Sequence, residues 1–323
     1  MPQDILLVCD MIDRIMCDVS RRNILLGAAA AAAMKPAQAA AAVNEVDTVS
    51  NGVYFHQGDI EGHGHCNNGW VIFKDYVLVI DANFPSGAQV ILPKIRAITQ
   101  KPIRFAFDTH HHGDHAYGNQ VWIENGATAV GHVGVAEEMK RHEPGRWDDT
   151  AKSRPDVAAS RLTPPSLLFP KELYFDDGEH RVELLHLGVA HTRGDAFAWL
   201  PKERILFSGD ACVNGAYNFV GDGDVEKWVA TLDGARKLGA RVLCPGHGPR
   251  GAADVLEDQQ QFFAGLRERV GALVKAKKTP GEVHGSIEKI RGELVSRSRI
   301  ARYVGKGLAA QVEKVHHEMT GRN

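Results

Sequence analysis

Apolar residues recur with two different spacings in the first half of the chain, one typical of strands and one typical of helices. Residues 46–55 and 69–80 are rich in β-branched and aromatic side chains, and the Lys74-Asp75 pair divides the second run, which predicts a hairpin. Residues 87–100 instead carry apolar side chains at helical spacing. Residues 103–107 form a short apolar run that predicts a further strand.

The same alternation of element types continues downstream. Strands alternate with helices and hairpins, a pattern typical of a layered α/β architecture. Histidines and aspartates follow several of the strands, where a rigid scaffold often presents chemical groups. The predicted strands are 182–187, 196–200, 205–207 and 241–244, and the predicted helices are 225–238 and 253–278.

Residues 141–170 interrupt this pattern. The segment is polar and contains five prolines, so it is expected to be a long loop, with or without a short helix. Long loops inside compact domains are often functional, and this one could flank a site and shape access to it. A surface excursion without a role is an equally good interpretation.

Composition and charge narrow the function classes. The 323 residues are 44% hydrophobic and 24% charged, as in ordinary globular proteins, and the formal net charge of −2 argues against a nucleic-acid partner. A small-molecule substrate is therefore the expected partner. The five cysteines show neither a CxxC spacing nor a dense disulfide pattern.

The N-terminal residues read as an export signal. Arg21 and Arg22 precede an apolar stretch with an alanine run, and the small-x-small sequence 37–39 offers a cleavage site. We interpret residues 1–39 as a twin-arginine signal, which predicts a periplasmic or secreted protein. The apolar stretch is too short for a stable membrane span.

Residues 109–115 read Thr-His-His-His-Gly-Asp-His and contain the densest group of chemical side chains. With His110 as the first ligand, the run becomes H-x-H-x-D-H. His110 and His112 alternate on an extended loop, so their rings can point the same way. Asp114 and His115 would turn toward a neighbouring position, and His111 would point away.

Three further candidates stand alone downstream, each after a strand-like run and close to glycine. They are His191, Asp210 and His247. Imidazole and carboxylate ligands without thiolate suit zinc, although iron or manganese can use the same set. A catalytic zinc also needs an open position for water, which such a site can provide.

This ordered set of motifs resembles the metallo-β-lactamase superfamily over residues 46–252. The resemblance implies an αββα sandwich with the site at one edge of the sheets, followed by a C-terminal helical extension over residues 253–323. It also implies two zinc ions. One would take His110, His112 and His191, the other would take Asp114, His115 and His247, and Asp210 would bridge them as in the glyoxalase II and lactonase branches.

Residues 218–224, with Trp228 after them, resemble a segment of the subclass B1 β-lactamases. Asn218 matches the asparagine thought to polarise the substrate carbonyl there. Three positions depart from subclass B1. Asp210 stands where those enzymes carry cysteine, Val213 stands where they carry the lysine that grips the β-lactam carboxylate, and His115 follows the pattern of other branches.

The resemblance implies a hydrolase that opens an amide, lactone or ester-type bond, including β-lactams, with a metal-activated hydroxide. Asp114 would orient the nucleophile and shuttle a proton. Three alternatives remain at this stage. They are a lactonase or thioesterase, a non-hydrolytic iron enzyme of the persulfide dioxygenase type, and a metal-binding accessory protein of a periplasmic pathway.

Overall fold

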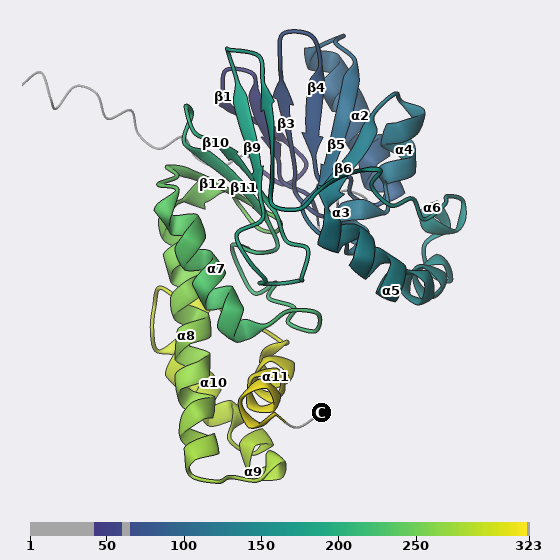
Figure 1. Cartoon of the computed structure of the whole chain (residues 1–323). Coiled ribbons are helices and arrows are strands. Elements are labelled where there is room, and N and C mark those ends of the chain that lie inside the picture. Colours follow the sequence, from purple (N-terminus) through teal and green to yellow (C-terminus); the bar gives the residue numbers. More distant parts are fainter. Residues whose placement is uncertain (1–41, 60–64, 322–323) are drawn as a thin grey trace, which may run out of the picture. The chain divides into compact units, whose positions relative to one another are not determined.

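Two β-sheets lie face to face, with helices on their outer faces (Figure 1). The computed structural model describes residues 42–59 and 65–321, and the export signal proposed for residues 1–39 lies outside them. Phe55, Phe107 and Phe207 belong to the apolar core between the two sheets. The layered α/β sandwich expected from the sequence is confirmed.

The first sheet has seven strands in the order β1-β2-β3-β4-β5-β6-β7. Helices α2 (Pro85–Ile98) and α4 (Asn119–Glu124) contribute Ile91, Ile95 and Trp122 to the core on its outer face. Strands β4, β5 and β6 run parallel, so their carboxyl ends share one edge. The strands are β1 (Val46–Ser50), β2 (Val53–His56), β3 (Asn68–Ile72), β4 (Val77–Ile80), β5 (Ile103–Asp108), β6 (Thr128–His132) and β7 (Leu167–Phe169).

The second sheet has six strands in the order β13-β12-β11-β10-β9-β8. Strands β11 and β12 run parallel, which brings their carboxyl ends together. Helix α7 (Val225–Lys237) covers the outer face, and the Trp228 indole donates to the Ala211 carbonyl at 2.7 Å. The strands are β8 (Glu172–Asp176), β9 (Arg181–Leu185), β10 (Phe197–Leu200), β11 (Ile205–Gly209), β12 (Val242–Pro245) and β13 (Gly251–Ala252).

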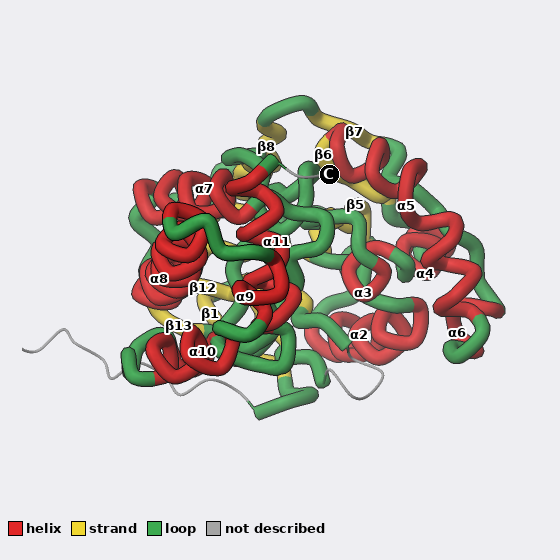
Figure 2. Tube along the Cα trace, turned by 90° about the horizontal axis from the view of Figure 1, so that it is seen from below, coloured by secondary structure: helices red, strands yellow, loops and turns green. Residues whose placement is uncertain are grey.

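The C-terminal extension is helical, as expected. Its apolar side chains join those of α7 in one core. In Figure 1 the helices of the extension continue from α7 to below the two sheets, and Figure 2 shows them from below. Of the helices in residues 42–59 and 65–321, none has the length and apolar character needed to cross a lipid bilayer. The extension contains α8 (Asp254–Lys275), α9 (Pro280–His284), α10 (Ile287–Val295), the 3-10 helix η1 (Ala301–Tyr303) and α11 (Leu308–Thr320).

Two segments differ from the sequence prediction. Residues 46–55 form two antiparallel strands rather than one, because Gly52 adopts a φ of 71° and turns the chain. The predicted loop 141–170 begins inside α5 (Val133–Ala151), which continues through Pro144. Buried Glu143 and ion pairs at helical spacing, such as Arg146 with Glu143 at 3.1 Å, hold this polar helix together. A four-residue helix, α6 (Pro155–Ala158), follows.

A stacked histidine pair, buried His132 at the start of α5 and half-buried His186, predicts a loss of stability in acid. The rings of His132 and His186 stack with centroids 4.0 Å apart, and burial, followed by the charge of His186, lowers the pKa of His132 to about 4. Because the unfolded chain takes up this proton near pH 6.5 and the folded chain only near pH 4, stability is lost as the pH falls below 6.5.

His132→Asn is expected to reduce this pH dependence while keeping the α5 N-cap, where His132 accepts from the Gly134 amide at 3.1 Å. Between pH 7.5 and pH 5, the free energy of unfolding should fall by about 1–2 kcal/mol less in the variant than in the wild type. Urea unfolding of chelator-treated protein at several pH values measures the free energy of unfolding of both proteins. The same change with pH in the wild type and the variant would contradict the low pKa assigned to His132.

Candidate metal centre

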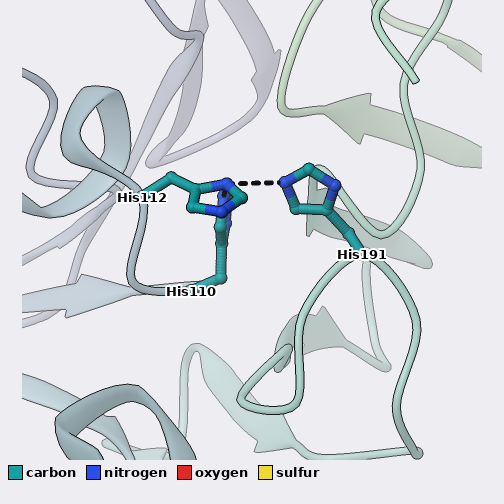
Figure 3. A group of neighbouring side chains, drawn as sticks. All are labelled: His110, His112 and His191. Atoms are coloured by element: carbon teal, nitrogen blue, oxygen red, sulfur yellow. Dashed lines mark hydrogen bonds between the residues drawn. The ribbon is translucent and has the colours of Figure 1, made fainter. Parts of the chain in front are cut away.

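Three histidines converge at the edge where β5 ends. His110 and His112 lie on the loop after β5, and His191 comes from the loop between β9 and β10. The His112 Nδ1 atom lies 3.2 Å from His110 Nε2 and 2.8 Å from His191 Nε2. Figure 3 shows the three rings directed toward a common point. Their ring nitrogens are close enough together to ligate one cation.

A second group lies beside the first. Asp114 and His115 belong to the short helix α3 (Gly113–Ala116), and His247 follows β12. The Asp114 Oδ2 atom lies 3.1 Å from His247 Nε2 and 3.6 Å from His115 Nε2. The ligand atoms of these three residues also lie close enough to one another to hold one ion.

Asp210 lies between the two groups, directly after β11. Its Oδ2 atom lies 3.7 Å from His191 Nε2 and 3.5 Å from His247 Nε2, and its Oδ1 atom lies 3.4 Å from His115 Nε2. A Cβ atom at residue 246 would lie 2.1 Å from Asp210 Oδ1, so only glycine lets the loop after β12 approach this closely. Asp210 therefore contacts residues of both groups.

Carboxylates outside the two groups fix the ligand rings. Asp222 accepts from His112 Nε2 at 2.7 Å, and Arg146 donates to both Asp222 oxygens at 2.6 and 2.8 Å. Asp81 lies 3.0 Å from His115 Nδ1 and accepts from the Thr109 amide and hydroxyl. These partners direct the other nitrogen of each ring toward the centre, an arrangement typical of metal-ligating histidines.

The pKa values of His110, His191 and Asp210 favour the forms that bind metal. Burial, followed by neighbouring imidazoles, lowers the pKa of His110 well below its ordinary value and that of His191 to about 3. Burial raises the pKa of Asp210, but His247 and His115 outweigh it and hold that pKa below the ordinary value. Neutral imidazoles and ionised carboxylates are the forms that bind metal. Burial lowers the pKa values of His115 and His247, but nearby acidic groups outweigh it and raise both, so a cation would have to displace a proton from these two rings.

Buried atoms without hydrogen bonds support the same assignment. His115 Nε2 and Asp210 Oδ1 are both buried, and neither makes a hydrogen bond. Such atoms cost free energy unless another group satisfies them, and a cation between them would do so.

His111 of the histidine-rich loop and Asn218 of the B1-like segment lie outside both ligand groups. His111 is buried and faces Glu143 and Asp222, at 3.6 and 3.5 Å. Asn218 is also buried, and its side-chain amide lies 3.5 Å from the Tyr303 carbonyl in the C-terminal extension. Asn218 does not line the cavity described below, so the geometry does not support its expected contact with a substrate carbonyl.

A cavity of about 500 Å³ opens onto the two groups. Helix α5 supplies Glu143, Arg146, Asp149 and Thr150, so the segment that interrupts the sequence pattern does flank the site. The loop after β11 supplies Tyr217 and Phe219. The other lining residues are Phe84, His112, Gly113, Asp114, Tyr117, His191, Asp210 and His247.

The described cysteines are buried and unpaired. Cys66 lies near His115 and Asp81, and burial raises its pKa to about 12, so its thiol stays protonated and is a poor ligand. Burial also raises the pKa of Cys212, two residues after Asp210.

Sequence reasoning missed several supporting residues. His65 Nδ1 lies 3.3 Å from Asp114 Oδ2, and Asp81, Asp222 and Arg146 hold the ligand rings. The position of Asp81 directly after a strand was the available signal, because the predicted ligands also follow strands. Arg146 had no such signal.

Comparisons with known proteins agree with this geometry. The family model of the metallo-β-lactamase superfamily matches residues 62–247. A metallo-β-lactamase type 2 of Bacteroides fragilis is 34% identical over 86 residues, which is 25% of this chain and 34% of that protein. A β-lactamase-like protein 2 homolog of Caenorhabditis elegans is 28% identical over 215 residues, 64% of this chain and 63% of that protein. The first match thus spans about a third of its relative, and the second spans just under two thirds of its relative.

Solved structures share the fold. A metallo-β-lactamase from Pontibacter korlensis aligns with a TM-score of 0.58 and 20% identity, covering 68% of this chain and 98% of that one. The metallo-β-lactamase DIM-1 aligns with a TM-score of 0.56 and 18% identity, covering 69% of this chain and 98% of that one. With its family-model match over residues 62–247 and its two adjoining ligand groups, this chain belongs to the metallo-β-lactamase superfamily.

Proposed function

We propose that this chain is a zinc-dependent hydrolase that binds two zinc ions and opens an amide, lactone or ester-type bond of a small molecule. The observation that carries the proposal is the contact of Asp210 with both ligand groups. His110, His112 and His191 would hold one ion, and Asp114, His115 and His247 would hold the other. A bound cation pair supplies an acidified water and polarises a carbonyl oxygen.

Asp114 is the residue best placed to move a proton. Its side chain is 19% exposed and lines the cavity, whereas the neighbouring His115 side chain is fully buried. The carboxylate oxygen of Asp114 that does not hold the ion would accept a proton from the attacking water and return it to the leaving group. His65, 3.3 Å from Asp114 Oδ2, orients this carboxylate.

The supporting residues keep the site rigid. Asp222 fixes the orientation of His112, and Asp81 fixes that of His115. The cavity that opens onto both ligand groups gives a small molecule access to them, which favours turnover over simple metal storage. We therefore prefer an enzyme to a metal-binding accessory protein.

A panel of hydrolysis assays tests the proposal. Chelator-stripped protein is reconstituted with zinc and assayed on nitrocefin, an acyl-homoserine lactone and an acyl thioester. Turnover of at least one substrate should appear with zinc and disappear on chelation. A zinc-loaded protein that is inert on the whole panel would contradict the proposal, as would oxygen uptake that requires iron.

We also propose that the protein acts in the periplasm or outside the cell. This rests on the paired arginines, the apolar stretch and the small-x-small sequence within residues 1–39. Fractionation of cells that express the full chain tests it, with Arg21→Lys and Arg22→Lys together as the matched variant.

A further inference from the structure

The cavity beside the candidate metal centre has one exposed aromatic wall. Phe219 is 54% exposed, the largest value among the large apolar side chains of the described residues. Its ring centroid lies 5.6 Å from that of His112 and 6.1 Å from that of His191. Tyr217 is 38% exposed, and its ring centroid lies 5.5 Å from that of His247. Covering these rings with an apolar ligand group removes them from water, which is favourable.

The second aromatic wall is rigid. Phe84 and Tyr117 pack edge to face with centroids 5.8 Å apart, and Trp147 supports Tyr117 at 4.6 Å. The Tyr117 hydroxyl donates to Glu143, so the polar end of this side chain already has a partner. Phe84 and Tyr117 are 8% and 1% exposed, so this wall is a fixed boundary of the cavity and offers a ligand little surface.

Away from the candidate metal centre, the described side chains that line the cavity offer a substrate carboxylate no free lysine or arginine. Arg146 is the only lysine or arginine among the described residues that line the cavity. Its guanidinium is held by both oxygens of Asp222 and by Glu143 at 3.1 Å. Asp149, 77% exposed at the same wall, pairs with Lys152 at 2.6 Å, and Lys152 does not line the cavity. Among the described residues that line the cavity, a carboxylated arm lying away from the candidate metal centre would meet no uncommitted lysine or arginine, so it would lose hydration there without a side-chain partner.

We infer that the site prefers neutral substrates in which the reacting carbonyl carries an apolar, aromatic arm that lies against Phe219 and Tyr217. Arms with a carboxylate are disfavoured. This inference rests on the proposed hydrolase function and narrows its substrate class. It also agrees with Val213, an apolar residue buried at the position where the B1-like resemblance would place a carboxylate-binding lysine.

A matched pair of esters tests the preference. The zinc-loaded full chain is assayed on 4-nitrophenyl phenylacetate and on the same ester with a carboxylate at the para position of the phenyl ring. The neutral ester should have a kcat/KM at least about ten-fold higher, equivalent to about 1.4 kcal/mol. Equal values, or a preference for the carboxylated ester, would overturn the inference.

Two variants test whether the exposed wall of Phe219 and Tyr217 binds the neutral ester. Phe219→Ala should raise KM for the neutral ester about ten-fold while kcat and zinc content stay near wild type. Tyr174→Ala, which removes a 43% exposed aromatic side chain on β8 that does not line the cavity, should change neither constant. An unchanged KM in Phe219→Ala would contradict the proposed contact.

A charge reversal tests the electrostatic part. Asp149→Lys should raise kcat/KM for the carboxylated ester relative to the neutral one by about three- to ten-fold. Asp148→Lys makes the same change at an adjacent exposed residue that does not line the cavity, and it should have a smaller effect. Equal shifts in both variants would show a general effect of net charge and would overturn this part of the argument.

A binding measurement separates this inference from the hydrolase proposal. Binding of phenylacetamide and of its para-carboxylated counterpart is followed by ligand-observed NMR. If no ester is turned over, the hydrolase proposal fails. Stronger binding of the neutral amide than of the carboxylated amide, lost in Phe219→Ala, would still support the inferred preference for a neutral, apolar arm. Equal binding of the two amides would overturn that preference, whether or not the esters are turned over.

Discussion

Asp210→Asn is expected to lower kcat/KM by on the order of a thousand-fold and to reduce the bound zinc. The substitution keeps the shape of the side chain but removes the charge that faces both ligand groups, at 3.7 Å from His191 and 3.5 Å from His247. A catalytic metal contributes several kcal/mol of transition-state stabilisation, and about 4 kcal/mol corresponds to a thousand-fold.

Zinc content by elemental analysis and kcat/KM on the best substrate of the panel measure this effect together. Asp258→Asn is the matched control, because Asp258 is also a buried carboxylate but pairs with Arg299 and Arg302 in the C-terminal extension. The control should lose stability and keep its zinc. Wild-type zinc and turnover in Asp210→Asn would contradict the bridging role.

Asp222→Asn is expected to lower kcat/KM by about ten- to hundred-fold and to weaken zinc binding by a similar factor. Asp222 accepts from His112 and holds Arg146, so loss of its charge weakens the orientation of a ligand ring without removing any ligand. Because Asp222 is not itself in either ligand triad, excess zinc should restore part of the activity.

Asp224→Asn provides the control for this variant. Asp224 lies on the same loop and caps α7 by accepting from the Lys227 amide at 2.9 Å, and asparagine is an equally good N-cap. The control should keep wild-type zinc affinity and turnover. If both variants behaved alike, the effect would come from the loop as a whole and not from the His112 partner.

Most of the fold could be predicted because its elements carry strong local patterns. The hairpin around the Lys74-Asp75 turn is confirmed as β3 and β4, and the helical spacing in residues 87–100 is confirmed as α2. The predicted ligands also meet, because parallel strands such as β11 and β12 present their carboxyl ends at one edge. Whether all seven bind metal stays a prediction.

Tertiary contacts explain what local patterns could not predict. Polar residues and prolines in 141–170 indicated a loop, yet the hydrogen bond between Tyr117 and Glu143 and the ion pair between Arg146 and Asp222 hold part of the segment in a helix. These partners lie far away in sequence, so no window around Pro144 contains the signal.

Asn218 shows the same limit for a motif. The segment matches subclass B1 by residue type, but here Gln311 of α11 donates to the Asn218 carbonyl at 2.7 Å and Lys314 lies 3.4 Å from the Gly221 carbonyl. The C-terminal extension thereby holds the loop with Phe219 exposed at the cavity and Asn218 buried on the other side. Short sequence similarity gives no information on such contacts.

Anomalous diffraction at the zinc absorption edge, from crystals of the zinc-loaded full chain, tests the central claim most directly. The account predicts two adjacent peaks, one within bonding distance of His110, His112 and His191 and the other of Asp114, His115 and His247, with Asp210 reaching both. A zinc ion bound instead among His111, His112 and Asp222, or no peak beside Asp210, would contradict it.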